Sequence, residues 1–520
     1  MPWPTATRED GAMHLTELAA RMPDKAAVVR AEDGAVTTYA ELERRSLQIA
    51  HFLDRHGLRV GDHVAVLMDN RPEYFEVLWG CLRSGIYVTP VNWHLTEGEA
   101  AYVVRDCGAR VLFTSSTVGE LAGRVAAQCS KTEAGDELVT VMVEGADSPF
   151  LDYAPTLDGE STEPREDEKE GFYFFYSSGT TGVPKGIEPN HEFPPFGTGL
   201  GIDHAVNLAF GFDDSTTYLC PAPMYHAAPS AWSMGAIRNG GTVVLMERFD
   251  ARECLRAIEA YKVTHVQFVP TMFVRMLKLP DEERLGFDLS SLKLVVHAAA
   301  PCPVDVKLRI IEWFGPVVME YYAGSEQAGM TMISSQEWLF HQGSVGRPLS
   351  GAVHIVDEDG QELPQGEIGT VYFEGGGTFR YYKDEEKTAR AFNANGWSTL
   401  GDLGYLDEEG YLYLADRRTD LILTGGVNVY PREVEDALVM HPAVADVAVI
   451  GVPDEDLGER VKAVVQLADG VEDTPELRAD LAAHSRERLA GFKCPREWEY
   501  VDQLPRTEAG KMLRRRLRQP

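Results

Sequence analysis

The sequence lacks the features that mark several classes of protein. Its seven cysteines include no Cys-x-x-Cys pair, so free thiols are favoured over a disulfide framework or a zinc knuckle. No apolar run reaches the roughly 18 residues of a membrane-spanning helix, and the first residues lack the basic and apolar segments of a secretory signal. These absences predict a cytoplasmic protein with no integral membrane segment.

Cations are scarce relative to acids. Lys and Arg total 49 against 81 Asp and Glu, which gives a net charge of −32. Such a surface repels nucleic acid and anionic membranes, so a polyanionic ligand must be bound locally, where Gly, Lys and Arg concentrate. Hydrophobic residues (44%) and charged residues (25%) are in the range of globular chains. The length suits three to four domains, or one large domain followed by a smaller one in the same chain.

Helix-like and strand-like patterns alternate over residues 38–113 and again from residue 171. This alternation predicts two α/β subdomains with parallel strands. Between them, residues 158–170 are almost entirely charged or small, which is typical of a solvated linker. Beyond Gly343, short strands separated by Gly and acidic turns indicate a small β-rich subdomain. A compact α+β pattern follows Asp420 and ends in a basic tail.

The strongest local signal is the segment YSSGTTGVPKG at Tyr176–Gly186, directly after an apolar strand. Its glycines let backbone N–H groups turn toward phosphate oxygens, while its hydroxyls and Lys185 add donors and a positive charge. The spacing is not that of the ordinary P-loop, and a simple Gly/Ser/Thr turn is the alternative. The candidate phosphate ligands are Ser177, Ser178, Gly179, Thr180, Thr181, Gly182 and Lys185.

This loop resembles the phosphate-binding signature of the adenylate-forming (AMP-binding) enzymes, which include acyl-CoA synthetases, nonribosomal adenylation domains and firefly luciferases. Further segments resemble motifs of that family in the same order: Glu320–Glu326, Leu400–Asp402, Asp416–Asp420, Gly425–Pro431 and Leu504–Lys511. The resemblance covers about residues 14–518. It implies an N-terminal domain (residues 1–418) of two α/β subdomains and a β-rich subdomain, followed by a small mobile α+β domain (residues 419–520).

The family's chemistry has two steps. A carboxylate attacks the α-phosphate of ATP and releases pyrophosphate, and the thiol of coenzyme A then displaces AMP. The resemblance implies that Lys511 bridges the carboxylate and the α-phosphate, that Ser325 hydrogen-bonds the α-phosphate, and that Glu326 holds Mg²⁺, a hard cation that prefers oxygen ligands. Glu326 is therefore the expected metal ligand.

Other residues of the motifs would bind the nucleotide. By the same resemblance, Tyr322 stacks on adenine, and Asp402 accepts both ribose hydroxyls with help from Arg417. The remaining members of this cofactor site are Ala299, Ala300, Pro301, Tyr321 and Ala323.

The second step implies that the C-terminal domain swings about a hinge near Thr419. This motion removes Lys511 and brings in Gly425 and Gly426, whose lack of side chains suits the thin pantetheine arm. No convincing base for the thiol is identifiable. His226 matches a family position between acyl pocket and tunnel and would act as a gate, although a structural role for a lone histidine is an equal alternative.

The sequence gives weaker evidence for the identity of the carboxylic acid substrate. Segments expected near it, such as residues 231–235, 298–300 and 323–324, are rich in Ala and Gly and contain no Lys or Arg. They suggest room for a hydrophobic monocarboxylic acid, either a fatty acid or a bulky polycyclic, steroid- or terpenoid-like one. Alternatively, these small residues only pack close to the sheet.

Departures from the family pattern leave other functions open. Glu188, close to Lys185, would oppose ATP binding by like charge unless it points to solvent, so the protein could specialise in forming the thioester from a supplied acyl-adenylate. Transfer to a carrier protein, a non-catalytic sensor that binds acyl-adenylates or nucleotides, and luciferase-like oxygenation are further alternatives. The expected partners are an acid, ATP and CoA, with no nucleic acid, and a homodimer stays open.

Overall fold

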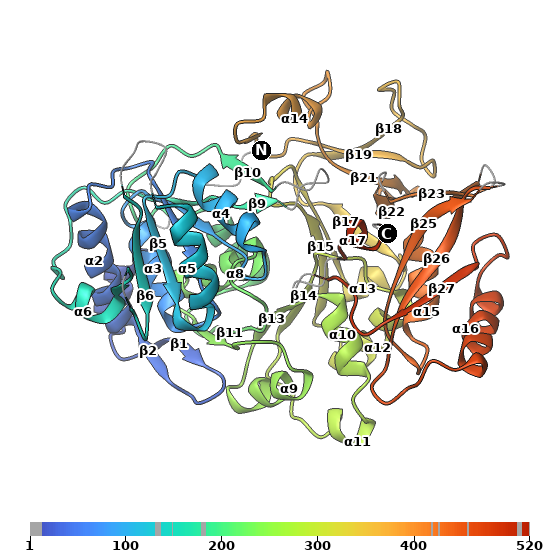
Figure 1. Cartoon of the computed structure of the whole chain (residues 1–520), viewed down its shortest axis with the longest axis horizontal. Coiled ribbons are helices and arrows are strands. Elements are labelled where there is room, and N and C mark those ends of the chain that lie inside the picture. The colour runs from blue at the N-terminus through green and yellow to red at the C-terminus, as the bar shows by residue number, and fades with distance from the viewer. Residues whose placement is uncertain are drawn as a thin grey trace.

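The computed structural model describes residues 13–130, 137–147, 149–177, 184–417, 420–424, 427–454, 457–506 and 512–518. Two large sheets form most of the molecule, and a smaller α+β unit, drawn in orange and red, lies at one side (Figure 1). The arrangement confirms the predicted α/β fold with a large N-terminal part and a small C-terminal part.

The first sheet has six parallel strands and contains the strands predicted from residues 38–113. Their spatial order is β7 (Leu151–Asp152), β6 (Val139–Val143), β5 (Val111–Ser115), β3 (His63–Leu67), β4 (Tyr87–Pro90) and β8 (Phe172–Tyr173). Every residue of β5 is buried, as expected of parallel strands with both faces covered. The helices of this region are α1 (Leu15–Arg21), α2 (Tyr39–Arg55), α3 (Pro72–Leu82), α4 (Glu97–Asp106), the 3₁₀ turn η1 (Ser116–Val118), α5 (Gly119–Gln128) and α6 (Tyr153–Asp158).

The second sheet has thirteen strands and joins the second α/β region to the β-rich region. Its order is β18 (Ala352–Val356), β19 (Gly369–Glu374), β21 (Ser398–Leu406), β22 (Leu412–Arg417), β17 (Ser344–Pro348), β16 (Met330–Ser334), β15 (Val318–Ala323), β14 (Leu294–His297), β13 (His265–Phe268), β11 (Thr217–Cys220), β12 (Thr242–Leu245), β1 (Ala26–Arg30) and β2 (Val36–Thr38). The strands from β15 to β1 are parallel, and those from β18 to β16 are antiparallel. The β-rich region therefore extends the α/β sheet.

The helices along this second sheet are α7 (Gly201–Phe210), α8 (Ala227–Arg238), α9 (Ala251–Ala260), α10 (Pro270–Leu277), α11 (Asp281–Arg284), α12 (Val304–Phe314), α13 (Ser335–Trp338) and α14 (Glu385–Arg390). A short third sheet, in the order β20 (Phe379–Tyr381), β10 (Lys185–Pro189) and β9 (Tyr176–Ser177), connects the β-rich region to the segment that follows the first sheet. This bridge places the two ends of the predicted phosphate loop beside the β-rich region (Figure 1).

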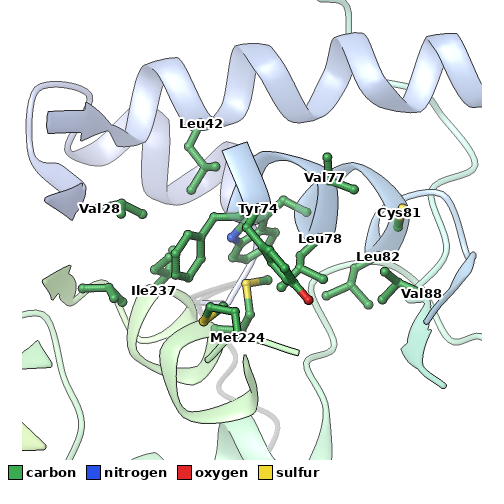
Figure 2. Close-up of a cluster of buried hydrophobic side chains, with 14 of the residues drawn as sticks. Val28, Leu42, Tyr74, Val77, Leu78, Cys81, Leu82, Val88, Met224 and Ile237 are labelled. Carbon is green, nitrogen blue, oxygen red and sulfur yellow. The ribbon is translucent and has the colours of Figure 1, made fainter. Parts of the chain in front are cut away.

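The largest hydrophobic cluster joins the two α/β regions. Figure 2 shows Tyr74 and Leu78 of α3 in one cluster with Met224 and Ile237, and Leu42 of α2 points into the same cluster. All of these side chains are less than 2% exposed. Because one core serves both regions, neither sheet is expected to be stable without the other.

Residues 168–170 contradict the prediction of a solvated linker. Glu168 is 6% exposed and pairs with the fully buried Arg83, with 2.7 Å between Oε1 and Nε. Glu170 is fully buried and pairs with Arg238, with 2.5 Å between Oε1 and Nη2. The composition was misleading because the arginine partners of these acids lie far away in the sequence.

The C-terminal unit is a mixed sheet with three helices. Its strands are β24 (Val427–Val429), β23 (Ile422–Thr424), β26 (Gly458–Leu467), β25 (Val444–Asp454) and β27 (Glu497–Val501), and its helices are α15 (Pro431–Val439), α16 (Pro475–Arg488) and α17 (Arg514–Leu517). Its buried Val434 and Leu438 belong to the same hydrophobic cluster as Phe273 of α10 and Ile310 of α12. The unit is therefore packed on the N-terminal part.

All seven cysteines are free and buried, as the sequence predicted. Within the described ranges, no helix is both long enough and apolar enough to cross a membrane.

Candidate active site

The predicted phosphate loop connects two paired strands. Lys185 of β10 lies opposite Ser177 of β9, and Gly186 lies opposite Tyr176. The loop is therefore the connection of a β-hairpin. Five predicted ligands lie outside the described residues: Ser178, Gly179, Thr180, Thr181 and Gly182.

Lys185 forms an ion pair across the third sheet. Its Nζ lies 3.1 Å from Oδ2 of Asp384, the N-cap residue of α14. This hydrogen bond raises the pKa of Lys185, so the ammonium stays charged at neutral pH. The contact fixes one end of the loop to the start of α14.

A second lysine, which the sequence analysis did not identify, accompanies Glu326. The Tyr381 hydroxyl donates a hydrogen bond of 3.0 Å to Oε1 of Glu326, and Nζ of Lys387 lies 3.6 Å from the centroid of the Tyr381 ring. Burial lowers the pKa of Lys387, and attraction to Glu326 and Asp384 opposes that effect. Two lysines and two carboxylates thus meet where the family's phosphates and metal are expected.

Tyr381, Asp384 and Lys387 come from one segment, FRYYKDEEKT, that reads as an ordinary charged surface stretch. One sequence feature could have pointed to this segment: it follows the Gly-rich run EGGGT. After that run the chain forms β20, which pairs with β10. Only the folded structure shows that Asp384 reaches Lys185 and that Lys387 lies near Glu326.

The two residues predicted to bind adenosine meet directly. The Tyr322 hydroxyl donates a hydrogen bond of 2.6 Å to Oδ2 of Asp402, and Asp402 is 8% exposed. In the pairing of β21 with β22, Asp402 lies opposite Arg417. Tyr322, Asp402 and Arg417, which separate motifs predicted to bind the nucleotide, therefore lie at neighbouring positions.

Ser325 and Glu326 lie in a tight turn after β15. The N–H of Gln327 donates to the carbonyl of Gly324 at 3.0 Å, and Gln327 has a φ of 57°. A Cβ on Gly324 would lie 2.6 Å from Cδ2 of Leu400 and 2.9 Å from Oε2 of Glu326. A side chain at this position would require Leu400 and Glu326 to move, and Ser325 is left exposed at the end of the sheet.

The loop Ala299–Ala300–Pro301 follows β14 at the same edge of the sheet. Ala299 has a φ of 71°, a strained conformation for a residue with a Cβ. Such strain is often found at binding sites. Ala323 ends the neighbouring β15, so the two segments lie at the carboxyl ends of adjacent parallel strands, the usual place for ligands in such sheets.

A buried charged group supports β15 from behind. Nζ of Lys307 lies 2.5 Å from Oε2 of Glu320, and Nε2 of His297 lies 3.6 Å from the same oxygen. Burial and the nearby Lys307 hold the pKa of His297 well below its usual value, so the imidazole is neutral. The pair anchors the strand whose end carries Tyr322 and Ser325.

His226 is the N-cap residue of α8 and is half-buried. Its ring centroid lies 4.4 Å from that of Tyr225. The position at the start of a helix along the sheet is compatible with both the gate and the structural role, so the gate stays a prediction.

The C-terminal candidates Lys511, Gly425 and Gly426 lie outside the described residues, and only their flanks are placed. Thr424 pairs with Val427, so the two glycines connect β23 to β24. Arg506 forms an isolated bridge with Met512, so the two residues that flank the Lys511 segment lie side by side.

No cluster of three His, Cys, Asp or Glu side chains with metal-binding geometry occurs among the described residues. Glu326 nevertheless offers Oε2 beside its contact with Tyr381. A single carboxylate is compatible with Mg²⁺, because this ion usually takes most of its ligands from substrate phosphates and water.

Some of the small residues taken as a sign of an open acyl pocket are packed tightly. A Cβ on Gly235 of α8 would lie 2.7 Å from Cγ2 of Val206 in α7, and Gly324 is in contact with Leu400. At these two positions the geometry favours the packing interpretation.

Glu188 is half-buried in β10, opposite Arg380 of β20. Its carboxylate also raises the pKa of Tyr87, although burial contributes more. Directly opposed residues of paired strands lie on the same face of the sheet, so Arg380 is the cross-strand neighbour of Glu188. A neighbouring cation of this kind would offset part of the repulsion between Glu188 and ATP.

These features define an enzyme of the adenylate-forming class: a hairpin loop with its lysine, a Tyr–Asp pair and a carboxylate at the carboxyl edge of a sheet, followed by a small α+β unit. A model of the AMP-binding enzyme family matches residues 15–383, and a model of the AMP-binding enzyme C-terminal domain matches residues 433–511. The chain belongs to this family, as its motifs predicted, and is an enzyme of the acyl-CoA synthetase type.

Several relatives resemble the chain over nearly their whole length. A long-chain-fatty-acid–CoA ligase of Bacillus subtilis (strain 168) is 32% identical, over 97% of this chain and 93% of the relative. A feruloyl-CoA synthase of Amycolatopsis sp. is 34% identical, over 96% of each chain. The solved o-succinylbenzoate CoA synthetase of Bacillus subtilis, in complex with its acyl-adenylate intermediate, has a TM-score of 0.79 and 27% identity, over 97% of this chain and 98% of that chain.

Proposed function

We propose that the protein is an ATP- and Mg²⁺-dependent ligase that converts a hydrophobic monocarboxylic acid, fatty or bulky and polycyclic, to its CoA thioester. The observation that carries this proposal is the hydrogen bond between Tyr322 and Asp402, because it joins two residues from separate motifs that are expected to bind the nucleotide. The family of the chain supports the same chemistry.

In the first step, a carboxylate oxygen of the acid attacks the α-phosphorus of ATP, and the bond to pyrophosphate breaks. The hairpin loop and Lys185 bind the β- and γ-phosphates, Ser325 donates to the α-phosphate, and Lys511 neutralises the approaching carboxylate. Glu326 holds Mg²⁺, which screens the charge of the phosphates when bound. Asp402, Arg417 and Tyr322 orient the nucleoside.

In the second step, the thiol of CoA loses its proton and its sulfur attacks the acyl carbon, and AMP leaves with the bonding electron pair. Residues 419–520 act as a mobile domain that withdraws Lys511 and presents Gly425 and Gly426 to the pantetheine arm. His226 gates the space between the acid and the thiol. The remainder, residues 1–418, holds the acyl-adenylate throughout.

A panel of acids incubated with ATP, Mg²⁺ and CoA tests the proposal, with AMP and acyl-CoA followed by mass spectrometry. We expect equal amounts of AMP and thioester with at least one hydrophobic acid, and loss of both products in Lys511→Ala. If no acid yields AMP, the proposed function is wrong.

The position of Glu188 motivates a second candidate, a ligase specialised for the thioester-forming step. Pyrophosphate release with ATP and acid, compared with CoA consumption on a synthetic acyl-adenylate, separates the two. Arg380 lies opposite Glu188 in the register of β10 and β20, which would offset the charge of Glu188, so we expect ready pyrophosphate release. Replacing CoA by a carrier protein in the same assay tests the alternative acceptor.

A further inference from the structure

Lys387 of α14 carries a charge that no acidic side chain contacts directly. Its Nζ lies 3.6 Å from the centroid of the Tyr381 ring, and within the described ranges this ammonium group forms no hydrogen bond and no ion pair. Lys185, by contrast, pairs with Asp384. A half-buried lysine without an acidic partner is unexpected in a chain with 81 acidic residues against 49 basic ones, because burying an unpaired charge is unfavourable.

Two carboxylates act on the Lys387 charge, but both are engaged elsewhere. Oε1 of Glu326 accepts the hydrogen bond from the Tyr381 hydroxyl. Oδ1 of Asp384 accepts the backbone N–H of Lys387 at 3.0 Å, and its Oδ2 lies 3.1 Å from Nζ of Lys185. Burial lowers the pKa of Lys387, Glu326 and Asp384 raise it, and the Lys185 ammonium lowers it. The four charges therefore interact, yet the Lys387 ammonium makes no hydrogen bond to the described residues.

Hydrogen bonds hold the first turn of α14 against the end of β20. The backbone N–H of Tyr381 donates to Oγ1 of Thr388 at 2.9 Å, and this hydroxyl donates to the carbonyl of Asp384 at 2.8 Å. Because β20 pairs with β10, the turn lies beside Lys185, where the phosphate hairpin ends. Lys387 thus extends from a hydrogen-bonded turn next to that hairpin.

A bound polyphosphate would give Lys387 its partner, a step that rests on the proposed function. Lys387 and Lys185 share one carboxylate neighbour, and the Tyr381 ring separates Lys387 from Glu326. The α-phosphate is expected at Ser325, next to Glu326, and the β- and γ-phosphates at Lys185. Lys387 lies between these two places, where phosphate oxygens would accept charge-assisted hydrogen bonds from its ammonium group.

We propose that Lys387 is a further catalytic residue, which binds the β- and γ-phosphates of ATP and stabilises the pyrophosphate that leaves. When the carboxylate oxygen of the acid attacks the α-phosphorus, the bond from that phosphorus to the bridging oxygen breaks, and its electron pair stays on pyrophosphate. Lys387 donates hydrogen bonds to the oxygens that gain this charge and transfers no proton. It acts in the first step, together with Lys185, and not in the attack of the thiol.

Calorimetric titration of the full-length protein with ATP and with AMP, each with Mg²⁺ and without an acid, tests this role. The two nucleotides share the nucleoside and the α-phosphate, and only ATP has the phosphates that Lys387 would contact. Lys387→Met keeps most of the aliphatic side chain over Tyr381 and removes the charge. We expect it to weaken ATP binding about tenfold or more and AMP binding less than about twofold.

Two further variants control for charge and for position. Lys387→Arg keeps the positive charge and should hold ATP affinity within about threefold of wild type. Lys383→Met makes the same chemical change in the same segment, at a side chain that is 43% exposed and lies 4.0 Å from Asp106, and should leave both affinities unchanged. Melting curves followed by circular dichroism verify folding. If Lys387→Met does not fold, Lys387→Gln replaces it with the same expected result.

The outcomes separate this role from the proposed function. Unchanged ATP affinity in Lys387→Met, or an equal loss of ATP and AMP affinity, overturns the role of Lys387 alone. If Lys387→Met selectively loses ATP affinity but no acid yields AMP with the wild-type protein, the proposed function is wrong and Lys387 is still a phosphate ligand. Binding of neither nucleotide by the wild-type protein overturns both.

Discussion

The ammonium group of Lys278, just after α10, donates a hydrogen bond of 3.4 Å to the carbonyl of Val439, the last residue of α15. It also bonds to the carbonyls of Val444 and Ala445 in β25. These bonds connect the two regions matched by the two family models. A cation at carbonyls that end a helix is a favourable arrangement.

Lys278→Met should weaken this docking and shift the balance between the two half-reactions. Charge-assisted hydrogen bonds contribute about 1.5–3 kcal/mol, so we expect the ratio of pyrophosphate release to thioester formation from synthetic acyl-adenylate to change about tenfold. Lys293→Met, which removes an exposed lysine elsewhere, is the matched control. If both rates change by the same factor, Lys278 does not control the arrangement of the domains.

Asp402→Ala should raise the KM for ATP by about tenfold or more, because the ribose hydroxyls and the Tyr322 hydroxyl lose a charged acceptor. The KM for the acid should change little. Steady-state kinetics with each substrate varied in turn measures the effect, with the exposed Asp469→Ala as control. An unchanged KM for ATP would place the nucleotide elsewhere.

Glu76 should make stability dependent on pH. Burial raises its pKa from 4.5 to about 7, although the Tyr153 hydroxyl donates to it at 2.6 Å and Arg45 lies 3.7 Å away. Between these two pKa values the folded state binds more protons than the unfolded state, so the free energy of unfolding falls as pH rises through this window.

Glu76→Gln keeps the acceptor for Tyr153 and removes the ionisation. The stability of this variant relative to wild type should therefore be about 1–3 kcal/mol more favourable at pH 8 than at pH 4.5. Urea denaturation at the two pH values measures this difference. Glu120→Gln, at a side chain that is 89% exposed, should show no such change, and an equal effect in both variants would contradict the assignment.

Arg238→Met should be strongly destabilising. Arg238 is fully buried, pairs with Glu170 and Asp203, and its guanidinium carbon lies 4.7 Å from the centroid of Trp79. Removing one partner of a buried ion pair leaves uncompensated charge and costs about 3–5 kcal/mol. Denaturation midpoints should show this loss, whereas Arg390→Met, at an exposed i, i+4 pair, should be nearly neutral. Comparable losses in the two variants would argue against the buried network.

The strands were largely predictable because local pattern determines them. The run HVAVL became β3, and LVVH became β14, each an apolar segment ended by polar or turn residues. That the β-rich strands continue the α/β sheet was not predictable, since strand pairing depends on contacts distant in sequence.

The residues expected to bind the nucleotide show what the sequence predicts and what it does not. Tyr322 and Asp402 were predicted from their motifs, yet only folding brings these residues, 80 positions apart, into a hydrogen bond. Lys387 and Tyr381 were not identified from the sequence because their segment looks like charged surface. Only the pairing of β20 with β10 shows that this segment lies beside the end of the phosphate loop. Glu170 was misjudged for the same reason, because its partner Arg238 is 68 positions away.

The sequence by itself determined the family, the order of the motifs and the two-step chemistry they imply, because these depend on residue types at fixed local spacing. Tertiary structure decided which charges are buried, that Arg380 lies opposite Glu188, and that Tyr381 contacts both Lys387 and Glu326. Burial and side-chain partners arise from packing between distant segments, which no local pattern of residues specifies.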